Sequence, residues 1–557
     1  MTNDKVMEPI DSLFSHWDKT GSPGAAVLVV KDGQIVHSKG YGFANLEYEI
    51  PISPSTVFHV ASVSKQFTAM AIAILAREGR LSLDDKVQKY VPELPEFSKP
   101  ITVRHLVHHV SGLRDQWELW TLAGGRMDDV INMEHLLKII SRQKELNFEP
   151  GSNFLYSNSG YTLLAIIVER VSGMPFSEYM QKTILGPLGM NDSHIHDDHQ
   201  LIVKNRAYSY SPRPEGGYKK SVLNYANYGA TSLFTTARDL AKWMGNYVDP
   251  KVGGPDVIRQ MKQGYTLSSG KQIEYGFGII SKEYRNLKLI YHTGSDAGFR
   301  AYLGDFPEIG LGMAVLSNVS TFPREPMAMK IADIFIDEEI AQGRRKPSPK
   351  KQPNKINYLS CPGTYLVKSL GKLVEISLCD QGMIIEMEGW EEPRLLINAN
   401  QADKDQSEIQ GEFSETDVFY TEDKKVKVTF LSQESKKDEL MSSPYQILLN
   451  TYGEDMGGQK IEIRHLTEEV LSQYAGTYYS PELETAYTLA VSEAKLVATH
   501  RRHSDAVLIS TGQDQFHAKS GPLDKLNFVR NREGMISGFD YSGHRVHGLR
   551  FERFQCQ

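Results

Sequence analysis

Residues 56–79 read TVFHVASVSKQFTAMAIAILAREG, an extended run followed by a long apolar helix. Apolar side chains recur at the spacing of one helix face between residues 67 and 75, and Gly79 ends the pattern. Ser62 and Lys65 lie three residues apart at the start of this helix, so the Lys65 amine can reach the Ser62 hydroxyl. A serine needs a neighbour that removes its proton, and the first helical turn favours developing negative charge. The segment therefore predicts a nucleophilic serine.

The Ser-x-x-Lys spacing occurs six times in the chain, so the spacing alone identifies no nucleophile. The other copies begin at Ser141, Ser268, Ser348, Ser369 and Ser492. Only the copy at Ser62 opens a long apolar helix directly after an extended segment. Taken alone, this segment leaves an ordinary helix cap as the alternative interpretation of Ser62.

A second candidate, Tyr156-Ser157-Asn158, follows a turn at residues 149–152 and precedes a helix predicted to begin near Gly160. A tyrosine in such a loop can point into a cleft. Its phenol has a pKa near 10, which a nearby ammonium lowers, so Tyr156 could act as a general base. The alternative is a packed tyrosine with a satisfied hydroxyl, and Tyr-x-Asn also occurs at Tyr225 and Tyr284.

The third candidate, His292-Thr293-Gly294, follows a predicted strand at Leu287–Tyr291. Its small residues would let an extended ligand approach the backbone and pair with the strand edge. Lys19-Thr20-Gly21 and Ser510-Thr511-Gly512 have a similar composition. The first of these lies before any predicted sheet and the second lies near the C-terminus, so neither matches the context of His292.

In this order, Ser62-x-x-Lys65, Tyr156-x-Asn158 and His292-Thr293-Gly294 resemble the active-site set of the serine β-lactamase and penicillin-binding protein superfamily. The tyrosine in the middle element is typical of its class C-like branch. The resemblance covers roughly residues 5–340. Further matching segments are FHVASVSK at 58–65, TVRHL at 102–106, SGL at 111–113, PLGM at 187–190 and YGFG at 275–278.

The resemblance implies an acyl-serine mechanism that needs no metal and no cofactor. Ser62 would attack a carbonyl carbon, and Tyr156, as a phenolate stabilised by Lys65, would take the proton and return it to the leaving group. The backbone N–H groups of Ser62 and Ser295 would form the oxyanion hole.

Asn158 and the edge His292-Thr293-Gly294 would orient the substrate. One departure from the penicillin-binding pattern lies in this edge. Its first residue is His292, where carboxypeptidases and β-lactamases have a lysine that helps to hold a substrate carboxylate. A histidine is mostly neutral at pH 7. This departure favours aminopeptidase, amidase or esterase relatives over carboxypeptidases and β-lactamases.

We therefore predict a serine hydrolase that cleaves amide or ester bonds of small peptides or amides, with D-residues among its substrates. A catalytic domain followed by two β-rich domains resembles the D-aminopeptidase relatives of the superfamily. A carboxylesterase and a class C-like β-lactamase are the alternatives within this class. A penicillin-binding receptor that is acylated once and never turned over is the alternative from another class.

The order of patterns predicts an α+β fold of the β-lactamase/transpeptidase type, in which an antiparallel sheet carries a helical insert. Strands are expected at residues 25–30 and 34–38, joined by an Asp-Gly hairpin, and again between residues 287 and 317. Helical patterns fill most of residues 62–247, and another covers residues 327–340.

Two small all-β, barrel-like domains are expected after the catalytic domain. The predicted domains are 1–341, a basic, proline-rich linker at 342–355, a β-rich domain at 356–455 and a second one at 456–557. A weak repeat supports the two β-rich domains, because Gly363-Thr364-Tyr365 returns as Gly476-Thr477-Tyr478.

Composition narrows the class of protein. The 557 residues are 40% hydrophobic and carry a net charge of −7, which excludes wholesale disorder and argues against a nucleic-acid binder.

No apolar run reaches the length of a membrane span, and no signal peptide is recognised, so a cytoplasmic protein is expected. The three cysteines are too few and too scattered for a disulfide scaffold or a zinc ribbon. A small-molecule or peptide substrate is the expected partner, and a homo-oligomer is left open.

One further motif competes with this interpretation. Residues 194–199 read HIHDDH, a pattern that could bind zinc. In metallo-hydrolases this pattern follows a buried strand, whereas here it follows a turn, so a solvated loop or an incidental metal site is expected and not metal catalysis. The chain has no G-x-S-x-G, no P-loop and no H-E-x-x-H.

Two polar stretches near the C-terminus, residues 500–505 and 513–515, are candidates for a loop that narrows the active site. Asp505 or Asp514 would then bind a substrate ammonium. Ordinary barrel turns are the alternative.

Overall fold

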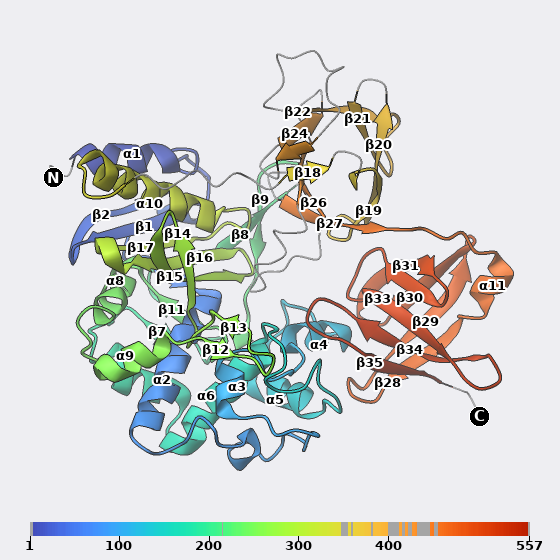
Figure 1. Ribbon diagram of the computed structural model, residues 1–557, viewed down its shortest axis with the longest axis horizontal. Coiled ribbons are helices and arrows are strands. Elements are labelled where there is room, and N and C mark those ends of the chain that lie inside the picture. The colour runs from blue at the N-terminus through green and yellow to red at the C-terminus, as the bar shows by residue number, and fades with distance from the viewer. Residues whose placement is uncertain are drawn as a thin grey trace. The chain divides into compact units, whose positions relative to one another are not determined.

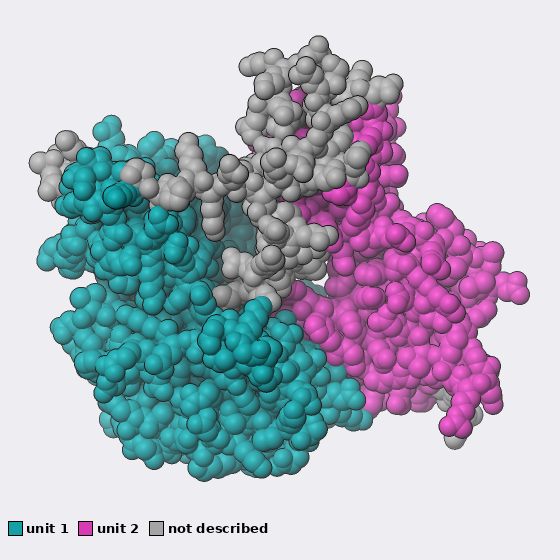
Figure 2. Space-filling model, in the orientation of Figure 1, with its two compact units in different colours: residues 1–116, 126–349 teal, residues 117–125, 350–557 magenta. Residues whose placement is uncertain are grey.

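The computed structural model of the chain describes residues 4–213, 215–346, 355–357, 360–379, 382–398, 412–414, 418–421, 426–431, 446–450 and 455–554. The chain forms two compact units (Figure 1, Figure 2). Unit 1 contains residues 1–116 and 126–349, and unit 2 contains residues 117–125 and 350–557. Most of the predicted linker, residues 347–354, lies outside the described residues, as does Cys556.

A six-stranded antiparallel sheet, in the order β14-β15-β16-β17-β1-β2, forms the framework of unit 1. Its strands are β1 Ala25–Lys31, β2 Gln34–Tyr41, β14 Ile280–Tyr284, β15 Leu287–Asp296, β16 Phe299–Phe306 and β17 Leu311–Ser317. β1 pairs with β17, with Val27 opposite Val315. Helices pack against these central strands, which explains why β1 and β17 read as continuous apolar runs. This architecture confirms the predicted β-lactamase/transpeptidase-like fold.

One strand is longer than the sequence predicts. β15 does not end at Tyr291 but continues to Asp296, because β16 keeps pairing with it as far as Phe299 opposite Asp296. His292, Thr293 and Gly294 are therefore strand residues.

A helical block lies between the two groups of strands in the sequence (Figure 1). The helices of unit 1 are α1 Asp4–Phe14, α2 Lys65–Arg77, α3 Val103–Val107, α5 Met133–Ser141, α6 Asn158–Ser172, α7 Phe176–Met180, α8 Ala237–Asn246, α9 Gly254–Met261 and α10 Arg324–Ala341. Residues 65–75 of α2 are all buried, including the polar residues Lys65, Gln66 and Thr68, so more than the one predicted apolar face is enclosed by the protein. No helix among the described residues is long and apolar enough to cross a membrane.

Short strands and turns join these helices. They are β3 Phe43–Asn45, β4 Ile50–Pro51, β5 Phe58–His59, β6 Ile131–Asn132, β7 His194–Ile195, β8 Ser209–Pro212, β9 Tyr218–Ser221, β10 Tyr225–Ala226, β11 Leu233–Thr235, β12 Tyr265–Thr266 and β13 Gln272–Ile273. Among them, β5, β11 and β7 form a small three-stranded sheet. β5 leads directly to the candidate nucleophile.

Unit 2 contains two closed eight-stranded barrels, as predicted. The first consists of β19 Gly363–Val367, β20 Lys372–Cys379, β21 Gly382–Met387, β22 Arg394–Asn398, β24 Val418–Thr421, β25 Lys427–Phe430, β26 Ile447–Asn450 and β27 Asp455–Ile461. The second, preceded by α11 Glu468–Ser472, consists of β28 Gly476–Ser480, β29 Thr485–Ser492, β30 Lys495–His500, β31 His503–Gly512, β32 Gln515–Ala518, β33 Lys525–Arg530, β34 Ile536–Ser542 and β35 Leu549–Arg553.

The Gly-Thr-Tyr repeat marks the same position in both barrels. Gly363 and Gly476 open the first strand of each barrel with φ of 148° and 147°, which strongly favours glycine. The tyrosines that follow make equivalent hydrogen bonds. Tyr365 donates to the Cys361 carbonyl at 2.5 Å and Tyr478 to the Tyr474 carbonyl at 2.7 Å. The repeat thus encodes how each barrel starts.

Unit 2 also includes a segment from the middle of the catalytic sequence, residues 117–125. This segment contains most of helix α4, Gln116–Leu122. Tyr541 donates to the Glu118 carboxylate at 2.8 Å, and Tyr487 donates to the Leu122 carbonyl at 3.0 Å. Two residues of the second barrel therefore donate hydrogen bonds to α4.

Candidate active site

Ser62 lies in a short 3-10 turn, η1, which spans Ala61–Ser64 and leads into α2. Ala61 has a φ of 48°, a left-handed conformation that is uncommon for a residue with a side chain. The Ser64 hydroxyl stabilises this turn, because it donates to the Ala61 carbonyl at 2.6 Å and accepts from the Leu233 N–H at 3.0 Å. The sequence predicts one continuous helix from Ser62, whereas the structure presents Ser62 on a tight turn before the helix.

Lys65 is completely buried, and its ammonium donates to three oxygen atoms. Its Nζ lies 3.0 Å from Ser62 Oγ, 2.8 Å from Asn158 Oδ1 and 2.7 Å from the Ala230 carbonyl oxygen. Buried ammonium groups require such partners. Lys65 therefore supplies a fixed positive charge next to the Ser62 hydroxyl.

Tyr156 lies next to this charge. Its ring centroid is 4.9 Å from Lys65 Nζ and 4.2 Å from the ring of His109. His109 Nδ1 accepts a hydrogen bond of 3.2 Å from the Ser157 N–H, which fixes the loop that carries Tyr156. The sequence analysis did not identify His109, although it lies just before the SGL segment.

Asn158 begins helix α6 and is held by Asp115. Its backbone N–H and its side-chain amide donate to the same Asp115 oxygen at 2.7 and 2.8 Å. Because the amide nitrogen is committed to Asp115, the amide oxygen faces Lys65. Asp115 is buried, and the sequence analysis did not identify it.

His292 is buried, and both of its ring nitrogens contact protein groups. Nδ1 lies 2.6 Å from the Thr293 carbonyl oxygen, so Nδ1 carries the proton and Nε2 accepts from the Tyr275 hydroxyl at 3.1 Å. Burial, reinforced by the positive charge of Lys65, lowers the pKa of His292 to about 3. His292 is therefore neutral at pH 7, as expected from its residue type.

Gly294 allows close packing of β15 against the turn that carries Ser62. A Cβ atom at Gly294 would collide with the Val60 carbonyl oxygen and would crowd Ala61. The sequence analysis attributed the small residues of this edge to ligand approach. At Gly294 the structure shows a different reason, since the chain's own backbone fills that space. Thr293 is buried, while Ser295, two residues further along the strand, is exposed.

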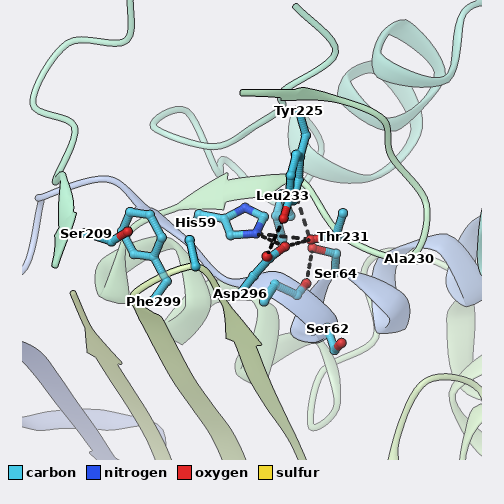
Figure 3. Close-up of polar contacts among 12 residues, drawn as sticks. His59, Ser62, Ser64, Ser209, Tyr225, Ala230, Thr231, Leu233, Asp296 and Phe299 are labelled. Atoms are coloured by element: carbon cyan, nitrogen blue, oxygen red, sulfur yellow. Dashed lines mark hydrogen bonds and ion pairs between the residues drawn. The ribbon is translucent and has the colours of Figure 1, made fainter. Parts of the chain in front are cut away.

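A polar cluster lies on another side of the η1 turn (Figure 3). We call His59, Tyr225, Thr231 and Asp296 the Asp296 cluster. Tyr225 donates to Asp296 Oδ1 at 2.9 Å, and His59 Nε2 and Thr231 Oγ1 lie 3.1 and 3.2 Å from Asp296 Oδ2. No sequence motif indicated this cluster.

The HIHDDH segment is only partly the expected solvated loop: Asp197 and Asp198 are exposed, whereas residues 194–196 are packed. His194 and Ile195 form β7, which pairs with β11, and the rings of His194 and His196 pack against Phe234. His194 Nε2 lies 3.3 Å from His196 Nδ1. Within the described residues, no group of three or more His, Cys, Asp and Glu side chains is arranged to hold a metal ion.

The two polar stretches of the second barrel have partners within unit 2. Asp514 accepts from Arg530 at 2.7 Å and from the Tyr474 hydroxyl at 2.8 Å. His503 Nε2 lies 2.8 Å from the Thr121 carbonyl oxygen. Asp514 is thus part of the internal structure of the barrel, which argues against its proposed contact with a substrate ammonium.

Comparison with known proteins identifies the family to which the chain belongs. The sequence profile described as Beta-lactamase matches residues 10–335, more than half of the chain. The chain belongs to the β-lactamase family. This family domain, together with D-aminopeptidase and penicillin-binding protein relatives, places the chain in the serine β-lactamase and penicillin-binding protein superfamily.

Relatives of this β-lactamase-family chain carry several names. D-aminopeptidase of Gluconobacter oxydans is 29% identical over 297 residues, 53% of this chain and 56% of the relative. Protein flp of Staphylococcus aureus is 27% identical over 330 residues, 58% of this chain and 64% of the relative. Penicillin-binding protein 4* of Bacillus subtilis is 24% identical over 406 residues, 68% of this chain and 87% of the relative. The matches thus span less than two thirds of the first two relatives.

Solved structures share the fold. An octameric penicillin-binding protein homologue from Pyrococcus abyssi has a TM-score of 0.57 and 24% identity, and the match covers 92% of this chain and 100% of that chain. D-amino acid amidase from Ochrobactrum anthropi SV3 has a TM-score of 0.52 and 21% identity, and the match covers 60% and 99% of the two chains. At these identities the likeness establishes the fold.

Proposed function

We propose that this chain is a serine hydrolase that acts without a metal, through an acyl-enzyme at Ser62, on amide or ester bonds of small peptides or amides that include D-residues. The observation that carries the proposal is the position of Lys65, which donates to both Ser62 and Asn158 beside the Tyr156 ring. This arrangement supplies a nucleophile, a fixed positive charge and a candidate base within one buried site.

The hydrogen bonds of Lys65 support Tyr156 as the base. Since the Lys65 ammonium already holds its protons in three bonds, it is poorly suited to receive another proton from Ser62. In the proposed reaction, Tyr156 enters as a phenolate that the charge of Lys65 stabilises. It takes the Ser62 proton during attack and returns it to the leaving group, and water later releases the acyl group.

The carbonyl oxygen would become an oxyanion during attack. The backbone N–H groups of Ser62 and Ser295 are the proposed donors to it. Asn158, together with Thr293 at the strand edge, would orient the substrate. Gly294 permits the close approach of the Ser62 turn and β15 that such a pair of donors needs.

The neutral His292 supports amides and amines over carboxylates as the preferred substrates. A buried imidazole whose two nitrogens are occupied offers no positive charge to a substrate carboxylate. The names of the D-aminopeptidase and D-amino acid amidase relatives agree with this preference.

Turnover of a substrate panel tests the proposal. The panel contains D- and L-amino-acid amides and anilides, 4-nitrophenyl esters and nitrocefin. We expect repeated turnover of D-amino-acid amides or anilides by the full chain, and none by Ser62→Ala. Ser141→Ala is the matched control, because Ser141 begins another Ser-x-x-Lys copy.

Each other outcome identifies an alternative. Turnover of esters alone indicates a carboxylesterase, and turnover of nitrocefin alone a class C-like β-lactamase. One equivalent of acylation at Ser62 with no further turnover of any substrate indicates a non-catalytic penicillin-binding receptor.

A further inference from the structure

The Asp296 carboxylate lies at the centre of a buried polar cluster close to Ser62 (Figure 3). Its side chain is 13% exposed and that of His59 is fully buried. Tyr225 donates to one carboxylate oxygen, while His59 and Thr231 contact the other. Three side chains thus hold the two oxygens of this largely buried carboxylate in place.

The donors of the cluster have defined hydrogen positions. His59 Nδ1 is buried and has no hydrogen-bond partner among the described residues, so a proton there would be unsatisfied. Nε2 therefore carries the proton and donates it to Asp296. Burial and the Asp296 charge raise the pKa of Tyr225 well above its usual range, so the phenol also remains a donor.

The cluster joins three segments that carry the proposed machinery. His59, on β5, precedes Ser62 by three residues. Asp296 directly follows Ser295 at the end of β15. Thr231 directly follows Ala230, whose carbonyl oxygen accepts a hydrogen bond from Lys65. One carboxylate thus connects the backbone segments of the nucleophile, the second oxyanion donor and the Lys65 site.

A direct role in proton transfer does not fit this geometry. His59 Nε2 faces Asp296 and Thr231, and the buried Nδ1 has no partner. The Ser62 hydroxyl instead contacts Lys65. The His59–Asp296 pair therefore does not form a serine–histidine–aspartate relay, although it contains two of the three residue types.

We propose that Asp296 is a positioning residue, which fixes the backbone N–H groups of Ser62 and Ser295 at the separation that a tetrahedral oxyanion requires. This inference rests on the proposed acyl-serine function. Because the oxyanion exists only during reaction, loosening its donors should lower kcat and leave KM largely unchanged. It should also weaken a tetrahedral boronate adduct, which resembles that intermediate.

The test compares Asp296→Asn with Asp239→Asn. Asp239 is the control, because it is a buried carboxylate of the same unit, on helix α8, that accepts from the Ser193 hydroxyl, the Asp192 N–H and Lys242. Turnover is measured with 4-nitrophenyl acetate, inhibition with phenylboronic acid, and Ser62 reactivity with a fluorophosphonate. Asp296→Asn should lower kcat and boronate affinity by about tenfold to a hundredfold, with KM changed less than threefold.

A second variant keeps the test valid if Asp296→Asn does not fold. Tyr225→Phe removes one donor and retains the ring, so it should show a smaller loss in the same two quantities. Unchanged kcat and boronate affinity in these variants would overturn the inference, and so would an equal loss in Asp239→Asn. If the unmodified chain does not react with the fluorophosphonate at Ser62, the proposed function itself is wrong.

Discussion

Asn158 donates its backbone N–H and its side-chain amide to one oxygen of Asp115, at 2.7 and 2.8 Å. This double contact fixes the amide so that its oxygen can only face Lys65, which donates to it at 2.8 Å. Asp115 therefore sets the orientation of a proposed substrate-binding residue that it precedes by 43 residues. Replacing Asp115 should therefore change the orientation of the Asn158 amide next to Lys65 and lower activity.

Asp115→Ala should lower kcat by about tenfold to a hundredfold, because the Asn158 amide is then free to rotate away from Lys65. Asp115→Asn, which retains one acceptor oxygen, should lose less. Steady-state kinetics with 4-nitrophenyl acetate measure both. Equal activity of Asp115→Ala and the unmodified chain would show that the orientation of Asn158 does not matter.

Ser62→Ala should reduce turnover by several orders of magnitude, since the parts of a nucleophilic unit fail together. A fluorophosphonate or a slowly released β-lactam should add its mass to the peptide that holds Ser62, as measured by mass spectrometry. Label on Ser141 or Ser268 would contradict the assignment, because each begins another Ser-x-x-Lys copy.

Activity should survive treatment with EDTA, because no step of the proposed mechanism uses a metal ion. His194→Ala combined with His196→Ala should likewise retain turnover. Loss of activity with EDTA and its recovery with zinc would instead indicate that a zinc site at residues 194–199 carries out the reaction.

Acid should destabilise the protein through its buried histidines. Burial lowers the pKa of His196 to about 3 and that of His108 to about 4, whereas the unfolded chain titrates near 6.5. The unfolded state then binds more protons at these positions between about pH 3 and 6.5. Their contribution to stability is therefore present above pH 6.5 and lost as the pH falls.

The Tm should accordingly drop between pH 7 and pH 4.5, and His196→Gln should make this drop shallower. His16→Gln is the control, because His16 is exposed. Parallel Tm curves for the unmodified chain and His196→Gln would show that His196 does not contribute.

Truncation after Glu462 removes the second barrel and tests whether that barrel gates the site. We expect Ser62 labelling and the substrate profile to persist, because Asp514 is held by Arg530 and Tyr474. The Tm should fall, since α4 loses its hydrogen bonds from Tyr487 and Tyr541. New activity on bulky or N-blocked substrates would instead demonstrate gating.

The local patterns of the sequence predicted most of the fold. The strand pairs, the apolar helix at residues 65–77 and the two barrels each have a periodicity or a repeat that is visible within a few residues. Ser62, Lys65 and Asn158 also carried local motifs, and the structure brings them together, while their catalytic roles stay predictions.

Asp115 and Asp296 could not be found in this way. Asp115 contacts Asn158 across 43 residues, and Asp296 contacts His59 across 237. A lone aspartate in a strand or before a helix has no pattern of its own, and its partner is known only once the chain is folded. The sequence also did not predict that α4 belongs to unit 2, because its partners Tyr487 and Tyr541 lie 365 and 423 residues further along the chain.

The capture of α4 by the second barrel has a consequence for synthesis on the ribosome. Leu122 and its hydrogen-bond partner Tyr487 are separated by 365 residues, and Glu118 and Tyr541 by 423. At about 5–20 residues per second, α4 emerges roughly 20–80 seconds before the strands that enclose it. During that interval α4, with its two tryptophans and two leucines, lacks the hydrogen bonds from Tyr487 and Tyr541, so we expect nascent chains to be most prone to aggregation until the second barrel is made.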